Sequence, residues 1–138
     1  MDQLDKEHEP ARRFKRGVRI LVVDDDALIR WSLEKSLSGA GYHVTTANDG
    51  VDAVARIEEG VFDIVITDMQ MPRMGGGELL SEVKKRAPET QVIILSGLFS
   101  REVARGAVAA GAAMFLQKPM DLDQINRAVE LMIRGITP

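Results

Sequence analysis

Residues 18–26 read VRILVVDDD, an apolar run that ends in three consecutive aspartates. The apolar positions 20–23 follow one another without the apolar–polar alternation of a strand that has one face in water. A run of this kind is typical of a strand covered on both faces, as in a parallel sheet between two layers of helices. The stretch therefore predicts a buried strand whose carboxyl end carries three carboxyl groups.

Four further apolar segments follow along the chain, separated by amphipathic stretches. The five expected strands are Val18–Val23, Tyr42–Thr46, Phe62–Thr67, Gln91–Leu95 and Ala113–Leu116. The clearest helical pattern covers 122–133, where apolar residues recur every three or four positions. Alternating strands and helices predict an α/β, doubly wound sheet. The second strand is mixed and the fifth is short, so we expect both at the sheet edges.

Composition and charge place the chain among ordinary globular domains. It has 138 residues, of which 45% are hydrophobic and 28% charged, which fits one domain. It has no cysteine, which excludes disulfides, thiolate zinc sites and cysteine nucleophiles. The longest apolar runs, about six residues, are far shorter than the roughly 20 that span a bilayer. The first ten residues lack the apolar core of a signal peptide, so we expect a cytoplasmic protein.

The N-terminal segment and the rest of the chain differ in net charge. Residues 1–19 hold six basic and four acidic side chains, whereas residues 20–138 hold twelve and seventeen, for a net charge of −3. Broad electrostatic binding of nucleic acid is therefore not expected. We predict a flexible polar and basic tail over 1–17, a folded domain over 18–134, and a C-terminal end over 135–138 without an output domain.

The expected strands deliver polar side chains to one rim of the sheet. Asp24 and Asp25 follow the first strand, and Asp68, Ser96 and Lys118 follow the third, fourth and fifth. In doubly wound folds the site lies beyond the carboxyl ends of the strands. Three carboxylates within a few ångströms repel one another, and a hard divalent cation such as Mg²⁺ relieves that repulsion. Both histidines lie off this rim, so a softer metal has no ligand set.

The same rim is suited to phosphoryl transfer. A carboxylate beside Mg²⁺ and an ammonium group can act as a nucleophile toward phosphorus and form an acyl phosphate. Such transfer needs mainly positioning and neutralisation of charge. Lys118 would supply charge, and the Ser96 hydroxyl a hydrogen bond to a phosphoryl oxygen. Pro119 after Lys118 predicts a fixed turn, which a cis bond would provide.

Two nearby residues are explained more simply by structure. Asp26 precedes the apolar residues 27–29, so we expect it to be the N-cap of the following helix. Trp31 lies in that helix, and aromatic residues are mostly buried or half-buried, so we expect it to pack there. Neither residue needs a chemical role.

Four segments at the strand ends resemble the receiver domain of bacterial two-component response regulators, over about residues 18–134. ILVVDDD (20–26) is similar to the acidic-pair motif, and DIVITDMQMP (63–72) to the phosphoacceptor segment. ILSG (94–97) is similar to the switch-hydroxyl segment, and FLQKP (115–119) to the segment with the lysine and the aromatic switch. DDDALIRW (24–31) looks like the receivers of nitrogen-regulation-type activators. The resemblance implies a flavodoxin-like, five-stranded parallel sheet in the order 2-1-3-4-5, with five helices on both faces.

The resemblance also implies a role for each matching residue. Asp68 would be phosphorylated. Asp25 would bind Mg²⁺ directly and Asp24 partly through water, and the other ligands would be Asp68 and the backbone carbonyl of Gln70. The phosphate-binding and switch group would consist of Ser96, Lys118 and Phe115. Mn²⁺ would be able to replace Mg²⁺. The donor would be a phosphohistidine on a sensor histidine kinase or phosphotransfer protein. The domain would be a signalling element rather than a turnover enzyme.

Phosphorylation would then change the face made by the fourth helix, the fifth strand and the fifth helix. That face would bind a downstream protein target or a second copy, with no membrane contact and no direct nucleic-acid binding. The main alternative is a phosphorylation-independent interaction module that keeps the fold without the chemistry.

Two enzyme or cofactor classes fit less well. A haloacid-dehalogenase-like phosphatase would place its nucleophile after the first strand, but the chain is short for that fold and its cap. A flavodoxin-like flavin binder shares the topology, but its phosphate loop should be rich in serine, threonine and glycine rather than aspartate.

Overall fold

The structure, a computed structural model, describes residues 17–97, 100–119 and 121–135. The predicted tail lies outside the described residues except for its last position, and so do 136–138 of the predicted C-terminal end. In the described part of the chain, no helix is long and apolar enough to cross a membrane.

Five parallel strands form one sheet in the order β2-β1-β3-β4-β5, which confirms the predicted order and the two predicted edge strands. The strands are β1 (Arg19–Val23), β2 (His43–Ala47), β3 (Ile64–Asp68), β4 (Gln91–Ser96) and β5 (Met114–Gln117). Each pair of neighbours is parallel, so all five carboxyl ends meet at the same edge of the sheet.

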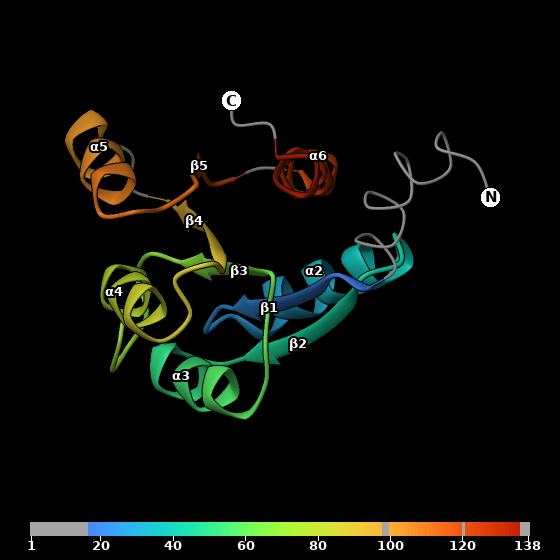
Figure 1. Ribbon diagram of the computed structural model, residues 1–138. Helices are drawn as coiled ribbons and strands as arrows, with labels where there is room; N and C mark the ends of the chain where they lie inside the picture. Colours follow the sequence, from blue (N-terminus) through green and yellow to red (C-terminus); the bar gives the residue numbers. More distant parts are fainter. Residues whose placement is uncertain (1–16, 98–99, 120, 136–138) are drawn as a thin grey trace, which may run out of the picture.

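The described helices cover both faces of this sheet. They are α2 (Ala27–Gly39), α3 (Gly50–Glu59), α4 (Gly76–Arg86), α5 (Arg101–Ala109) and α6 (Leu122–Ile133). Helices α2 and α6 pack on one face, and α3, α4 and α5 on the other (Figure 1). The described part therefore has the three-layer α/β/α arrangement of a doubly wound fold.

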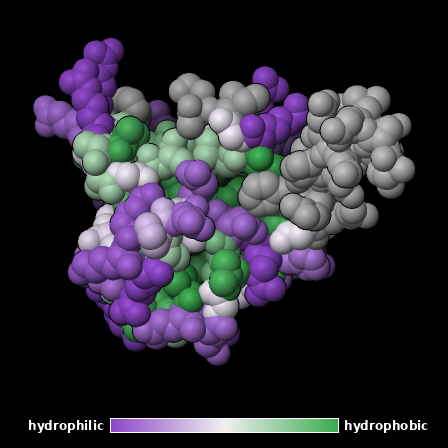
Figure 2. Space-filling view, viewed as in Figure 1, coloured by the Kyte–Doolittle hydropathy of each residue, from purple (hydrophilic) through white to green (hydrophobic). Residues whose placement is uncertain are grey.

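Alternate side chains of each central strand enter different cores. In β1, Ile20 and Val22 belong to the core under α2 and α6, whereas Leu21 and Val23 belong to the core under α3, α4 and α5. All four are at most 1% exposed. This double burial explains why the sequence of the strand lacks alternation. On the face seen in Figure 2, hydrophilic residues cover much of the described surface.

Short polar side chains begin most of the helices. The carboxylate of Asp26 accepts hydrogen bonds from the backbone N–H groups of Leu28 (2.9 Å) and Ile29 (3.3 Å), so its predicted capping role is confirmed. Helices α3, α5 and α6 begin in the same way at Asp49, Ser100 and Asp121. Helix α4 differs, because its N-cap is a glycine without a side-chain bond.

The expectation that Trp31 packs on helix α2 as a buried or half-buried residue was wrong. Its side chain is 56% exposed, and the Lys35 ammonium lies 5.9 Å from the centre of its ring. The reason is the phase of α2, which turns Leu33 and Leu37 toward the core. Two residues along a helix correspond to about 200°, so Trp31 is directed away from the sheet.

Candidate functional site

The parallel register brings the polar strand ends together. Val23 pairs with Thr67, Asp68 with Leu95, and Ser96 with Gln117. The residues at or just after these positions are the candidates named from the sequence: Asp24, Asp25, Asp68, Ser96 and Lys118. The structure places all five at the carboxyl edge of the sheet.

Three of these residues form an acidic cluster. One carboxylate oxygen from each of Asp24, Asp25 and Asp68 lies within 4.8 Å of the others. Asp24 is buried, Asp68 is half-buried and Asp25 is exposed, so the cluster faces solvent on one side. A backbone hydrogen bond fixes Asp24 to the end of β2, because its N–H donates to the Ala47 carbonyl (3.3 Å). An oxygen-only set of this kind fits a hard divalent cation and offers no soft ligand.

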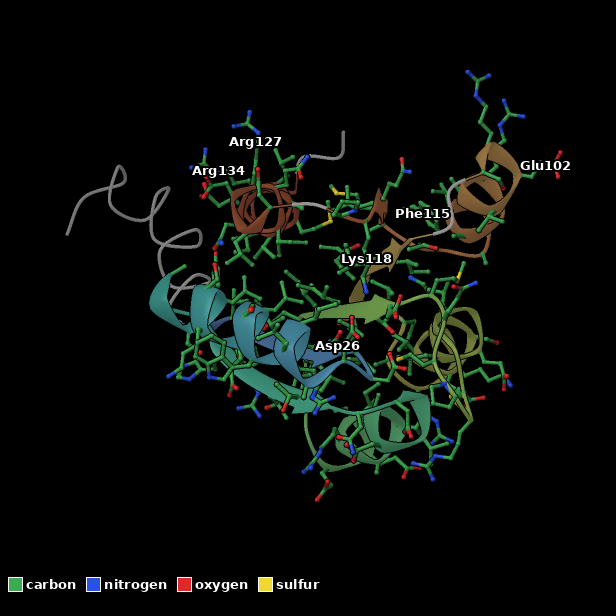
Figure 3. The ribbon with its side chains drawn as sticks, turned by 180° about the vertical axis from the view of Figure 1, so that it is seen from behind. Asp26, Glu102, Phe115, Lys118, Arg127 and Arg134 are labelled. Carbon is green, nitrogen blue, oxygen red and sulfur yellow. The ribbon has the colours of Figure 1, made fainter. Side chains whose placement is uncertain are left out.

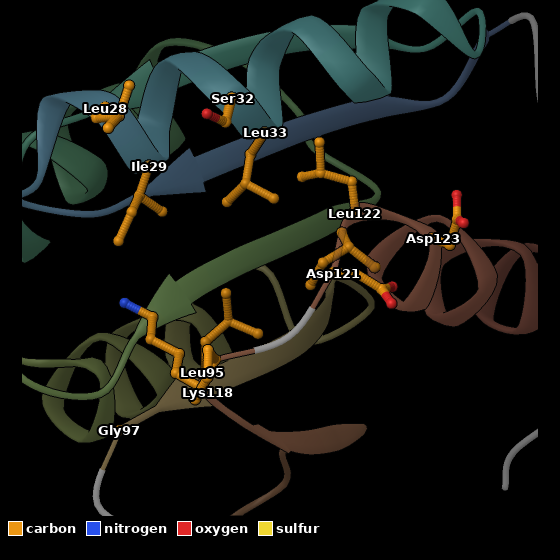
Figure 4. Close-up of a pocket in the computed structure, with 12 residues that line it drawn as sticks. Leu28, Ile29, Ser32, Leu33, Leu95, Gly97, Lys118, Asp121, Leu122 and Asp123 are labelled. Carbon is orange, nitrogen blue, oxygen red and sulfur yellow. The ribbon is translucent and has the colours of Figure 1, made fainter.

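Lys118 places a positive charge against this cluster. Its Nζ lies 3.0 Å from Asp24 Oδ2 and 3.5 Å from Asp68 Oδ1. Its backbone N–H donates to the Ser96 carbonyl at 2.7 Å, which extends the sheet by one bond beyond β5. The Lys118–Pro119 bond is cis. The close-up in Figure 4 and the wider view in Figure 3 show the lysine side chain beside the strand ends.

Burial and charge shift two pKa values in the site. Burial raises the pKa of the Asp68 carboxyl above its usual 3.8; Lys118 opposes the rise and the charge of Asp24 adds to it. Burial alone would lower the pKa of Lys118, but its hydrogen bond to Asp24 and the charges of Asp24 and Asp68 outweigh that effect and raise it. Lys118 is therefore a cation at neutral pH, and it faces more carboxylates than it can neutralise.

We expect Asp68→Asn to raise the melting temperature in metal-free buffer at neutral pH. The raised pKa means that ionised Asp68 is less favourable in the folded chain than in the unfolded one, and asparagine removes this charge at nearly the same shape. A gain of about 1 kcal/mol corresponds to about 2–5 °C in a domain of this size. Thermal unfolding followed by circular dichroism measures it.

The pH dependence provides the control for this prediction. As pH falls through the raised folded pKa, wild-type Asp68 becomes protonated, so the advantage of asparagine should shrink. It should be smallest below 3.8, where both states of the wild type are protonated at this position. A gain that does not change between neutral and acidic pH would contradict a charge origin.

The remaining sequence candidates lie around the cluster. Ser96 is 1% exposed at the end of β4. Phe115 is half-buried in β5 and packs against the core beneath α3, α4 and α5 (Figure 3). The backbone N–H of Gln70 lies 3.5 Å from Asp68 Oδ1, which places Gln70 next to the acidic cluster.

Sequence reasoning missed Arg30 as a neighbour of the site. Its Nη1 donates to the backbone carbonyl of Asp24 at 2.7 Å. Arg30 lies one helical turn after the N-cap Asp26, and its backbone N–H donates to the Asp26 carbonyl at 3.0 Å. Its position in the first turn of the expected helix was the available signal, since such residues can reach back to the loop before the helix.

An apolar pocket borders the site on the side of α2. Its lining includes Ile29 and Leu33 from α2, Leu95 from β4 and Ile125 from α6, with Lys118 at its edge (Figure 4). The pocket contributes no further carboxylate to the acidic cluster.

With this geometry described, comparison with known proteins identifies the family. The model of the response regulator receiver domain matches residues 20–130, so the chain belongs to that family. It is 39% identical over 124 residues to the DNA-binding transcriptional regulator NtrC of Salmonella typhimurium, which covers 90% of this chain and 26% of NtrC. It is 40% identical over 113 residues to the transcriptional regulatory protein ZraR of the same organism, covering 82% and 26%. The chain thus spans about a quarter of the length of these relatives.

Solved structures agree with the family. The receiver domain of the Francisella response regulator 1452 is 30% identical with a TM-score of 0.81, covering 86% of this chain and 98% of that one. A CheY-like receiver domain from Methanospirillum hungatei is 30% identical with a TM-score of 0.82, covering 86% and 95%. A chain of the CheX-CheY-BeF3-Mg+2 complex from Borrelia burgdorferi is 28% identical with a TM-score of 0.80, covering 85% of this chain and 89% of that one. The predicted family, its nitrogen-regulation type and the predicted fold are confirmed.

Proposed function

We propose that Asp68 is the phosphoacceptor of this receiver domain and that a phosphohistidine on a sensor histidine kinase or phosphotransfer protein is the donor. The observation that carries the proposal is the contact of Asp68 with the Lys118 ammonium, 3.5 Å away, inside a cluster of three carboxylates. The domain is a signalling domain. We propose further that it is no turnover enzyme, that it works in the cytoplasm, and that residues 18–134 are the receiver unit.

The acidic cluster fits Mg²⁺, with Mn²⁺ as a substitute. Asp24, Asp25 and Asp68 would hold the cation through carboxylate oxygens, and Gln70 through its backbone carbonyl. The ligand atoms of the cluster support this assignment, because they are carboxylate oxygens without a sulfur or imidazole ligand among them. A bound Mg²⁺ would supply positive charge that neutralises the oxygens of the phosphoryl group.

The transfer itself forms one bond and breaks one. A carboxylate oxygen of Asp68 attacks phosphorus, and the electrons of the phosphorus–nitrogen bond return to the donor imidazole. The imidazole leaves neutral when its other ring nitrogen carries a proton, and Asp68 becomes an acyl phosphate. Lys118 holds positive charge beside the transferred group, and the Ser96 hydroxyl donates a hydrogen bond to a phosphoryl oxygen.

The phosphoryl group would then change the surface made by α5, β5 and α6. Ser96 would move toward the phosphoryl group and Phe115 would turn inward. The position of Phe115 supports this assignment, because its side chain is half-buried and packs against the core beneath α5. The changed surface would bind a downstream protein or a second copy, without membrane contact or direct binding of nucleic acid.

We expect the wild type to gain one phosphoryl group in intact mass when it is incubated with acetyl phosphate and Mg²⁺. Asp68→Asn should gain none, and removal of Mg²⁺ by EDTA should prevent the gain. Asp123→Asn, an exposed carboxyl in the first turn of α6, is the matched control and should be labelled like the wild type. No gain under conditions in which Mg²⁺ binds would contradict the proposal and favour the interaction module.

A further inference from the structure

An ion pair ties together two loops at the carboxyl edge of the sheet. Arg73, in the loop between β3 and α4, donates from Nε to Asp49 Oδ2 at 2.8 Å, and its Nη2 lies 2.6 Å from the same oxygen. Asp49 precedes α3, and its side chain is 9% exposed. Its other oxygen accepts the N–H of Asp52 at 2.9 Å. Both oxygens of this carboxylate are therefore engaged, which fixes the direction in which Asp49 holds the arginine.

The backbone of Arg73 adopts a conformation that favours glycine. Its φ is 69°, and in the described part of the chain it is the one non-glycine residue with a positive φ. A long side chain is strained in this region, and strained residues persist where surrounding contacts fix them. An arginine at this position can form the ion pair with Asp49, whereas a glycine cannot. The pair therefore accounts for a side chain at a position whose backbone disfavours one.

A second contact joins the same two loops. The N–H of Gly50 donates to the Met74 carbonyl at 3.1 Å. A Cβ atom at Gly50 would lie 2.5 Å from Met74 Cγ and 2.6 Å from the Met74 carbonyl oxygen, so the loops pack as closely as a glycine allows. The loop between β3 and α4 is thus held against the first turn of α3 by both backbone and side chain.

The two segments that the ion pair joins lie beside the acidic cluster. Ala47, the last residue of β2 and two residues before Asp49, accepts the N–H of Asp24 through its carbonyl. Gln70 lies between the phosphoacceptor Asp68 and Arg73, and its N–H is 3.5 Å from Asp68 Oδ1. The ion pair therefore joins the segment just after β2, whose last residue holds Asp24, to the loop that follows Asp68. The ion pair itself includes none of the three carboxylates of the cluster.

We propose that Asp49 and Arg73 are positioning residues for the divalent-cation site, because they hold residues 70–74 in place before the cation binds. This inference rests on the proposed function of the acidic cluster and of the Gln70 carbonyl. A ligand that is already in place loses little freedom on binding, so a loop released from Asp49 should bind the cation more weakly. Residues that orient metal ligands commonly change metal affinity by 10–100-fold, and this pair acts one step further away.

The test is the Mg²⁺ dissociation constant of the full chain, measured by titration calorimetry. Arg73→Gly suits the backbone at this position, and Asp49→Asn keeps an oxygen that can cap α3, so both variants should fold. We expect each to raise the dissociation constant about 3–10-fold. The double variant should add little to the larger single effect, because the two residues act as a pair. Arg73→Lys should recover part of the affinity.

A matched control separates this effect from the loss of any arginine. Arg56→Ala removes an exposed arginine whose Nε lies 3.6 Å from Asp52 Oδ1 on α3, without touching the loop after β3. Its dissociation constant for Mg²⁺ should equal that of the wild type. A loss of affinity in this control as large as the loss in Arg73→Gly would overturn the assignment of the effect to Asp49 and Arg73.

Phosphorylation by acetyl phosphate at increasing Mg²⁺ gives a second readout. The concentration of Mg²⁺ that gives half of the maximal rate should rise in Arg73→Gly, while the maximal rate stays near that of the wild type. An unchanged half-saturating concentration and an unchanged dissociation constant would overturn the inference and leave a purely stabilising ion pair.

The two proposals fail in different ways. A wild type that takes up no phosphoryl group, with a dissociation constant that still rises in the variants, would overturn the phosphoacceptor and keep the positioning pair. A wild type phosphorylated at Asp68, with variants that bind Mg²⁺ equally well, would overturn the positioning pair alone.

Discussion

Replacing Lys118 by methionine is expected to lower the free energy of unfolding in metal-free buffer by about 3 kcal/mol, as when one partner of a buried ion pair is removed. The Asp24 side chain is only 2% exposed, and the Lys118 ammonium lies 3.0 Å from it. Without that ammonium, the Asp24 and Asp68 carboxylates have no ion-pair partner among the described residues. Methionine keeps most of the apolar stem of lysine, so the loss should come from charge rather than from packing. Urea unfolding measures the change.

The effect of Mg²⁺ identifies the cause of that loss. A cation at the acidic cluster would replace the missing ammonium charge, so saturating Mg²⁺ should restore most of the stability of Lys118→Met. The variant should also bind Mg²⁺ more tightly than the wild type, because no ammonium competes for the carboxylates. An equal loss of stability with and without Mg²⁺ would contradict this account and assign Lys118 a packing role.

Two further variants complete the comparison. Asp24→Asn in the Lys118→Met background removes the unpaired carboxylate and should recover stability in metal-free buffer. Lys85→Met changes a lysine whose side chain is 71% exposed and lies 3.8 Å from Glu82. It should change the free energy of unfolding by less than about 0.5 kcal/mol, since exposed ion pairs contribute little.

The fold was predictable because each central strand is buried on both faces. Burial on both faces produces continuous apolar runs such as 20–23 and 92–95. These runs begin and end within two residues of the bounds of β1 and β4 in the structure. The predicted segment Phe62–Thr67 begins two residues before β3, although Phe62 is 6% exposed. Burial of an apolar residue before a strand gives the same sequence signal as burial within it.

The site was predictable to the extent that it consists of strand ends. A parallel sheet gathers its carboxyl ends at one edge, so Asp24, Asp68, Ser96 and Lys118 could be brought together without knowing any loop. Arg30 and the pair of Asp49 and Arg73 depend on the paths of loops instead. Asp49 and Arg73 are separated by 24 positions, and their contact requires a left-handed backbone at Arg73 that the residue type does not indicate. Loop-dependent contacts of this kind left no pattern in the sequence.

In the first turn of α4, replacing glycine by alanine is expected to change the stability of the protein in opposite directions at two adjacent residues. Gly76→Ala is expected to destabilise the protein by about 2–3 kcal/mol, the cost of forcing an extra carbon into a packed site. Its Cβ would lie 2.5 Å from the Asp68 carbonyl oxygen and 3.0 Å from Met69 Cα. Both are backbone atoms, so no side chain can rotate to make room.

Gly77→Ala is expected to stabilise the protein by about 0.5–1 kcal/mol, because alanine is the better helix former. No atom outside its own chain neighbours and its own helix lies within 4 Å of a Cβ at this position. Urea unfolding of both variants measures the two signs on the same helical turn. Gly76→Ala should also slow phosphorylation, because room for its Cβ requires α4 to move away from the strand end that carries Asp68. Equal stabilisation by both alanines would contradict the close approach of α4 to β3, and with it the packing that places Asp68.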